Sequence, residues 1–172
     1  MNVIRTDCLV IGAGLAGCAY ALQAAQRGLD VQLLSLNGPL SANSDWAQGG
    51  IIYSVNSDPA LFARDIMDAS DQLANPAAVE HLVREGPIAV KELLLDTLGI
   101  PFDRTEDGGL EFTREGGHHE RRIIHSKDTT GHAILASVAA RVDETPNIHR
   151  RLGWVAIDLL TLYAMATSED RK

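Results

Sequence analysis

Three glycines with the spacing G-x-G-x-x-G constrain the fold of this chain more than any other feature. The glycine motif, which begins at Gly12 and continues with Gly14 and Gly17, directly follows the apolar run Cys8–Ile11, and an apolar, alanine-rich stretch comes after it. A second apolar run then occupies residues 31–35. The order strand, glycine turn, helix, strand is typical of a β-α-β unit that binds a dinucleotide. The alternative is a helix that is merely kinked by glycine.

Each glycine has a physical task in such a unit. Gly12 lets the backbone turn out of the strand, Gly14 leaves room for a diphosphate, and Gly17 lets the helix lie close to the strand. Backbone N–H groups and the positive end of the helix dipole then face the phosphates. The predicted contacts at this turn are Gly12, Ala13, Gly14, Leu15, Ala16 and Gly17.

One part of the usual dinucleotide fingerprint is missing. An Asp or Glu at the end of the second strand commonly holds the ribose. Here Ser35, Leu36 and Asn37 occupy that place, and Asp30 precedes the strand, where we interpret it as a turn residue. The chain is therefore not a standard NAD dehydrogenase, and other groups must hold the ribose.

The composition fits a single α/β domain with a sizeable core. The chain has 172 residues, 45% of them hydrophobic, and a formal net charge of −8, which argues against nonspecific nucleic-acid binding. Cys8 and Cys18 have no metal-ligand spacing, so we expect free thiols in a reducing compartment.

The apolar stretch from Cys8 to Ala25 could also be taken for a signal peptide. We reject this alternative because cleavage there would cut the helix of a complete β-α-β unit. No other stretch is apolar and long enough to span a bilayer. We therefore expect a cytoplasmic protein without a membrane anchor.

A second glycine motif follows a polar loop. Gly49 and Gly50 come after Trp46-Ala47-Gln48, and a glycine pair can bring backbone N–H groups against a flat ligand. The alternative is a simple loop before a strand at 51–55. In both interpretations the polar loop runs from Asn37 to Asp45.

Proline and glycine predict the boundaries of the middle elements. Asp58-Pro59, Asn75-Pro76 and Gly86-Pro87 should each begin a helix, the first running to about Leu73. Gly99 should end the third. A hairpin is predicted from two short strands, 100–104 and 110–113.

A locally basic run spans residues 114–128 and contains three of the six histidines. It could receive an anionic substrate or the cofactor's phosphates, or it could be a solvated loop with internal ion pairs. His118 and His119 are adjacent and point apart in extended chain, and His125 has no helical partner. We therefore predict no metal site.

The last predicted elements are a helix and two strands. The helix should begin near Thr130, capped by Asp128 or Thr130 itself, with His132 in its first turn. Two strands are then predicted at 147–151 and 154–162.

Three motifs in this order carry a resemblance to a known family. They are Asp7–Gly17, the segment Asn43–Ile51 with its A-Q-G-G, and the segment Thr113–Gly131 with T-R-E-G-G-H, R-I-I-H and D-T-T-G. Together they resemble the N-terminal part of the L-aspartate oxidases, within the flavoprotein family of succinate dehydrogenase and fumarate reductase. The resemblance covers about residues 3–160.

The resemblance implies a cofactor and a reaction. These enzymes bind FAD and oxidise L-aspartate to iminoaspartate with O2 or fumarate as acceptor. Their product goes to quinolinate synthase in NAD biosynthesis. Glu115 matches a glutamate that orients the substrate through its amino group. Besides the first glycine turn, the implied FAD contacts are Ser35, Leu36, Asn43, Ser44, Ala47, Gln48, Gly49 and Gly50.

Two departures from the family qualify this expectation. Asn43 stands where succinate dehydrogenases carry the histidine that bonds covalently to flavin, so the FAD should be noncovalent. Leu36 stands where some aspartate oxidases have a lysine, so this contact to FAD would lack a charged side chain.

Family members are much longer than this chain, so we expect an inactive fragment. Their capping domain, C-terminal helical domain and catalytic arginine lie in later segments, and no residue here is assigned as catalytic base. The expected fold is a truncated Rossmann-like FAD-binding domain with a parallel sheet, a helical insertion and a small hairpin. It divides into a β-α-β unit (1–36), the flavin loop, insertion and hairpin (37–127), and a helix with return strands (128–172).

Two other functions stay open at this point. The chain could belong to a soluble flavoprotein like fumarate reductase or succinate dehydrogenase, or it could be a non-catalytic nucleotide-binding remnant.

Overall fold

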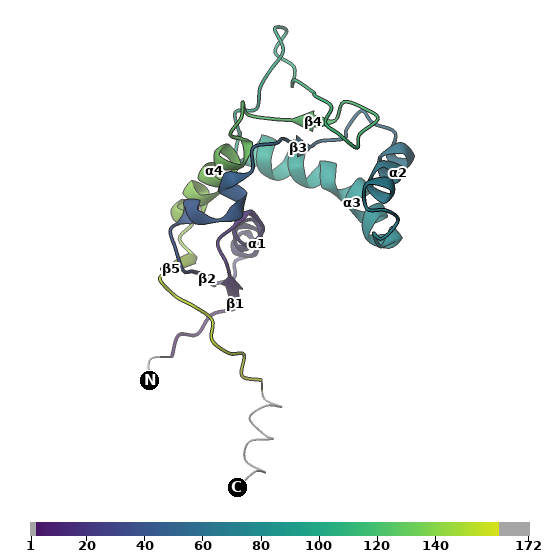
Figure 1. Ribbon diagram of the computed structural model, residues 1–172. Helices are drawn as coiled ribbons and strands as arrows, with labels where there is room; N and C mark the ends of the chain where they lie inside the picture. Colours follow the sequence, from purple (N-terminus) through teal and green to yellow (C-terminus); the bar gives the residue numbers. More distant parts are fainter. Residues whose placement is uncertain (1–2, 162–172) are drawn as a thin grey trace.

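The computed structural model describes residues 3–161 and shows an α/β fold built on a parallel sheet (Figure 1). Strands β1 (Cys8–Ile11), β2 (Val31–Ser35) and β5 (Ile148–Leu152) lie in the order β1-β2-β5. Helix α1 (Leu15–Gln26) connects β1 to β2. The predicted β-α-β unit and the parallel sheet are thereby confirmed.

The main core lies between this sheet and two helices. Helix α1 and helix α4 (Thr130–Glu144) pack against each other, and their apolar faces share one core with β2. Cys18, Leu33 and Val138 are among its fully buried members. Removing such aliphatic side chains from water contributes about 1.5–3 kcal/mol each. The small residues of α1 allow this close approach.

Among the described residues, side chains pack against one face of strand β1 and leave its other face uncovered. Val10 is buried, whereas Leu9 and Ile11, which point to the opposite face, are 55% and 65% exposed. Parallel sheets are normally covered on both faces. Within residues 3–161, the face of β1 that carries Leu9 and Ile11 is therefore uncovered.

The helical insertion contains α2 (Pro59–Ala69) and α3 (Pro76–Ala89), which lie beside each other away from the parallel sheet (Figure 1). Their predicted caps are confirmed: the Asp58 side chain accepts from the Ala60 N–H at 2.9 Å, and Asn75 accepts from the Ala77 N–H at 3.0 Å. No helix within residues 3–161 is long and apolar enough to cross a membrane.

Two predicted helix boundaries are wrong. Helix α2 ends at Ala69 instead of Leu73, because Asp71 and Gln72 adopt left-handed φ angles of 51° and 62°. Gly86-Pro87 does not begin a new helix, since α3 continues through Pro87 and passes into a π-helix, Val90–Thr97. Proline inside a helix leaves the carbonyl four residues earlier, here that of Val83, without its usual N–H donor, and the helix nevertheless continues past it.

The remaining strands are shorter than predicted. Strand β3 (Ile51–Ile52) pairs antiparallel with β4 (Ile123–Ile124), so the strand expected at 51–55 covers two residues. The hairpin is a tight turn closed by one bridge, Arg104 to Leu110, without regular strands. The strand at 147–151 is confirmed by β5, whereas residues 154–161 form no strand and residue 162 lies outside the described residues.

A buried ion pair connects the insertion to the segment before β4. Arg122 is 0% exposed, and its guanidinium donates to the Asp65 carboxylate at 2.8 Å and lies 4.7 Å from the ring centre of Phe62. Asp65 also accepts from the His119 backbone N–H at 3.0 Å. Burial raises the pKa of the Asp65 carboxyl, but the His119 hydrogen bonds and the Arg122 charge outweigh it and hold that pKa below its usual value.

Substitution of Gly17 by alanine should destabilise the fold. A Cβ at this position would overlap the carbonyl oxygen of Gly12. The clash should lower the free energy of unfolding by about 2 kcal/mol, measured by urea denaturation. Gly116→Ala is the matched control, because a Cβ there meets nothing within 4 Å, and we expect a change of at most about 0.5 kcal/mol. Equal stability of the two variants would contradict the close packing.

Asp65→Asn should make the free energy of unfolding less dependent on pH in the acidic range. Because the folded pKa of Asp65 is depressed, its stabilisation is full above the unfolded value of about 3.9 and is lost as pH falls through the folded pKa. We expect a loss of about 3 kcal/mol at pH 7 that shrinks below about pH 4, measured by urea unfolding across this range. Asp68→Asn, an exposed change on the same helix, should show neither effect.

Candidate functional site

The first glycine turn has the geometry of a diphosphate-binding site. Gly12 has a φ of +106°, and Gly14 is the N-cap of α1 without a side-chain cap. The backbone N–H groups of Gly14 and Ala16 donate to no acceptor among residues 3–161. Gly12 and Ala16 are exposed, whereas the side chain of Ala13 belongs to the core. Only the backbone of Ala13 could therefore serve a ligand.

The buried thiol of Cys18, in helix α1, contacts the backbone of the glycine turn. The Cys18 thiol donates to the carbonyl oxygen of Ala13 at 3.4 Å. Burial raises the pKa of this thiol, although the Arg150 charge opposes the shift, so the sulfur stays protonated and able to donate. Cys8 is half-buried and also free, as the sequence predicted.

The loop with the second glycine motif lies directly against the first turn. Ser44, in the short 3-10 helix Asn43–Trp46, accepts a hydrogen bond from the Leu15 N–H at 3.3 Å. A Cβ on Gly14 would lie 3.6 Å from the Ser44 hydroxyl oxygen. The two motifs, separated in sequence, therefore form one continuous surface.

Helix α4 holds the same loop from the other side. The Gly131 N–H donates to the Ala47 carbonyl at 2.9 Å, and the His132 ring contacts the Asp45 carboxylate at 2.8 Å. A Cβ on Gly131 would overlap the Ser44 carbonyl oxygen. Glycine at this position is therefore what allows the loop to rest on the helix.

The cap predicted for α4 is wrong. Thr129 is the N-cap and makes no side-chain cap hydrogen bond, and neither Asp128 nor Thr130 supplies one. The Thr130 hydroxyl instead accepts from the Ser126 N–H at 3.1 Å. The loop carbonyl of Ala47 takes the place of a capping side chain, because it meets the Gly131 N–H directly.

Glu115 lies at the glycine pair. Its carboxylate accepts from the Gly50 N–H at 3.3 Å and lies 3.6 Å from where a Gly49 Cβ would be. A Cβ on Gly50 would overlap the side chain of Ile123, so this glycine permits the pairing of β3 with β4. The implied substrate-orienting residue and the implied flavin loop are thus in direct contact.

The residues expected at the ribose end lie at the same edge of the sheet as the turn. The Gly12 N–H donates to the Leu34 carbonyl at 2.9 Å, which places Ser35 and Leu36 just beyond it. The Ser35 hydroxyl donates to the Asn37 carbonyl, and Leu36 is 62% exposed. Asp30, interpreted as a turn residue, also pairs with His149 at 2.8 Å.

Sequence reasoning missed the partners of the histidines. Asp103 accepts from the Lys127 N–H and contacts His125, both at 2.8 Å, which fixes the turn before α4. The Lys127 hydrogen bond is the main cause that lowers the pKa of Asp103, with His125 adding to it against the effect of burial. In the sequence, only the acidic residue Asp103 just before the hairpin turn could have indicated a partner for His125. Within residues 3–161 no group of three or more His, Cys, Asp or Glu side chains could hold a metal ion.

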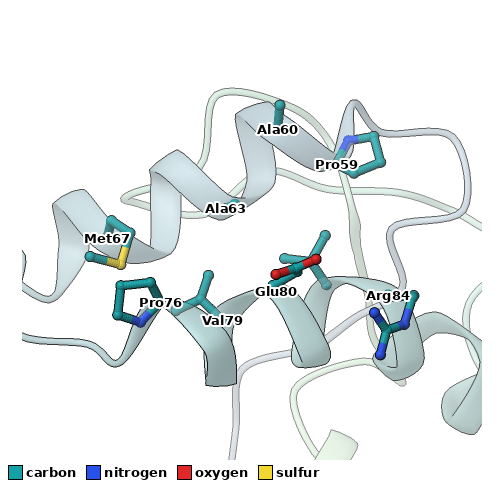
Figure 2. A pocket seen from close by; sticks show the side chains of 9 residues that line it. Pro59, Ala60, Ala63, Met67, Pro76, Val79, Glu80 and Arg84 are labelled. Atoms are coloured by element: carbon teal, nitrogen blue, oxygen red, sulfur yellow. The ribbon is translucent and has the colours of Figure 1, made fainter.

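A separate hollow of about 660 Å³ lies between α2 and α3 (Figure 2). Apolar side chains dominate its lining, with Ala63, Met67 and Val79 facing one another across the two helices. It offers no row of backbone N–H groups of the kind that a diphosphate needs. The glycine turn, and not this hollow, is the candidate cofactor site.

The residues at the turn fit FAD better than NAD. Unpaired N–H groups at a helix start suit a diphosphate, and the flat glycine segment 49–50 suits a planar ring beside it. No acidic side chain stands at the end of β2, where NAD enzymes hold the ribose.

Comparison with known proteins gives the same cofactor. A family model described as an FAD binding domain matches residues 7–167. The chain is 42% identical to an L-aspartate oxidase of Halobacterium salinarum over 93% of its own length and 31% of the relative. It is 37% identical to a chloroplastic L-aspartate oxidase of Nicotiana tabacum, covering 90% of this chain and 24% of that protein. The chain thus spans less than a third of these relatives.

Solved structures show the same fold. A quinol-fumarate reductase with menaquinol molecules superposes with a TM-score of 0.85 at 25% identity, over 94% of this chain and 28% of that one. A quinol fumarate reductase of E. coli gives a TM-score of 0.81 at 26% identity, over 87% and 26%.

Gly131→Ala should weaken FAD binding without unfolding the protein. The added Cβ must displace the loop at Ser44 and Ala47, which it would overlap or crowd. We expect about tenfold weaker affinity, or about 1.4 kcal/mol, measured by quenching of flavin fluorescence. Gly38→Ala, where a Cβ meets nothing within 4 Å, should bind FAD as the parent does. Unchanged affinity in the Gly131 variant would show that the loop position does not matter.

The motifs, the geometry of the turn and the matches to known proteins point to one cofactor and one group of proteins. The chain belongs to the family of FAD-binding domains, and within that family it is similar to the L-aspartate oxidases.

Proposed function

We propose that this chain is the FAD-binding part of an enzyme that oxidises L-aspartate to iminoaspartate, with O2 or fumarate as electron acceptor. The observation that carries the proposal is the position of Glu115. Its carboxylate lies 3.3 Å from the Gly50 N–H, at the segment that we assign to the flavin. The names of the relatives in two kingdoms of organisms support the same substrate.

Glu115 gives the site a way to recognise an amino acid. A carboxylate attracts the substrate ammonium group and repels a dicarboxylate that lacks one. The hydrogen bond to Gly50 and the neighbouring Gly49 hold this carboxylate at the edge of the flavin segment. Its role is therefore to orient the substrate and to select aspartate over succinate.

The cofactor contacts follow from the same geometry. The N–H groups of Gly14 and Ala16 would hold the diphosphate, with Ser44 and the segment Ala47–Gly50 along the rest of the cofactor. Bound FAD supplies the two-electron acceptor for an amine oxidation. Asn43 has no nucleophilic nitrogen, so the cofactor would be noncovalent.

The remaining parts of the proposal concern the cell and the complete enzyme. We place the protein in the cytoplasm, with iminoaspartate passing to quinolinate synthase for NAD biosynthesis. No residue described here is proposed as the catalytic base, which we assign to a later segment of the longer family members.

A soluble flavoprotein like fumarate reductase is the second candidate. The likeness to two quinol fumarate reductases, with TM-scores of 0.85 and 0.81, favours it. Such an enzyme would act on dicarboxylates without an amino group, so an acidic Glu115 at the flavin segment would serve no purpose. A non-catalytic remnant would bind FAD but respond to neither substrate.

Glu115→Gln should remove the preference for L-aspartate. With FAD bound to the 172-residue chain, L-aspartate should perturb the visible flavin spectrum at lower concentration than succinate does. Loss of the carboxylate should weaken aspartate binding about tenfold and leave succinate binding equal or tighter. Spectral titration of both ligands measures this change.

Glu111→Gln is the matched control, since it removes an exposed carboxylate from the same segment. It should leave both titrations unchanged. A parent protein that responds to succinate and not to aspartate would favour the fumarate reductase alternative, and hydrogen peroxide production at an enzyme-like rate would contradict the assignment of the base elsewhere.

A further inference from the structure

A polar hollow on the insertion side of the molecule has no part in the function proposed above. It has a volume of about 620 Å³ and is lined by Thr113, Arg114, His119 and Arg121. An antiparallel bridge between Thr113 and Ile123, with N–H···O distances of 2.8 and 3.2 Å, brings the two ends of this segment together. Two arginines from opposite sides of a chain reversal thus line one hollow.

The two guanidinium groups lack counter-charges. Arg114 and Arg121 are both exposed, and neither makes an ion pair or side-chain hydrogen bond within residues 3–161. Two like charges in one hollow repel each other unless an anion lies between them.

The acidic groups nearby are already engaged. Asp65 accepts from Arg122 at 2.8 Å and from the His119 N–H at 3.0 Å. Glu120 pairs with Arg122 at 3.2 Å and accepts from the Asp58 N–H at 3.3 Å. Asp65 and Glu120 are thus held by Arg122 and His119, and neither makes an ion pair with Arg114 or Arg121.

The wall of the hollow is also held in place. Asp65, which is only 3% exposed, contacts the Nδ1 atom of His119 and so fixes the imidazole. The other ring nitrogen has no partner among the described residues. Thr113 also lines the hollow, and its hydroxyl donates to the Ile123 carbonyl at 3.4 Å. The hollow therefore combines the exposed guanidinium groups of Arg114 and Arg121 with an imidazole, that of His119, held in place by Asp65.

We propose that this hollow binds a small oxyanion, held by paired hydrogen bonds from the Arg114 and Arg121 guanidinium groups. Carboxylate and phosphate share the required chemistry, because both present two oxygens at the spacing of the guanidinium fork. The proposal is independent of the flavin and of the substrate assignment, since none of these four side chains is placed at the flavin loop.

Calorimetric titration of the 172-residue chain without FAD tests the site. Succinate and inorganic phosphate are the probes, at constant ionic strength set with sodium chloride. We expect millimolar or tighter binding of at least one probe, and about tenfold weaker binding in the double variant Arg114→Gln, Arg121→Gln. Arg27→Gln, which removes an exposed guanidinium at the end of α1, should bind as the parent does.

The probe that binds identifies whether the ligand is a carboxylate or a phosphate. Binding of neither probe, or equal binding by the parent and the double variant, overturns the proposal. If the double variant does not fold by circular dichroism, Arg114→Lys with Arg121→Lys replaces it. That variant keeps both charges but loses the planar fork, so several-fold weaker binding supports the site and unchanged binding overturns it.

Discussion

Backbone contacts that only glycine permits hold the candidate site together. A Cβ on Gly17 would overlap the Gly12 carbonyl, and one on Gly131 would overlap the Ser44 carbonyl. The first contact sets how closely α1 approaches the strand, and the second sets how closely α4 approaches the flavin loop. Because the loop lies between these two helix starts, its position follows from backbone packing and hardly depends on flexible side chains. A rigid site of this kind loses little conformational entropy when a cofactor binds.

A second constraint connects the insertion to this site. The fully buried Arg122 requires a partner, because an unpaired charge in the core is costly, and Asp65 on α2 supplies it. The next residue, Ile123, belongs to β4, which pairs with β3 directly after Gly50. The ion pair therefore fixes the insertion relative to the flavin loop. It also explains why the segment carrying Glu115 reaches the loop, although that segment contains little regular structure.

Local signals in the sequence predicted most of the fold. The glycine turn, the caps at Asp58 and Asn75 and the parallel β-α-β unit depend on residues close in sequence, and all are confirmed. The failures depend on distant partners or on alternatives of similar energy. Asp45 and His132 lie 87 positions apart, so no local pattern could pair them, and the α4 cap was missed because a loop carbonyl replaces a side chain. The helix through Pro87 was missed because a Gly-Pro pair usually marks a helix start, whereas here the helix tolerates the missing N–H and continues as a π-helix.

The exposure of Glu115 limits what this part of the protein can do by itself. Its carboxylate is solvent-exposed, and in water two unit charges 4 Å apart attract each other by only about 1 kcal/mol. The same pair gains several-fold in strength where water is excluded, because the effective dielectric constant falls. Selection of an ammonium group by Glu115 is therefore modest, on the order of tenfold or less, in the residues described. It becomes stronger where the flavin and further protein surface enclose the carboxylate. The described residues place the Glu115 carboxylate beside the loop that we assign to the cofactor, and the strength of its selection depends on what covers it.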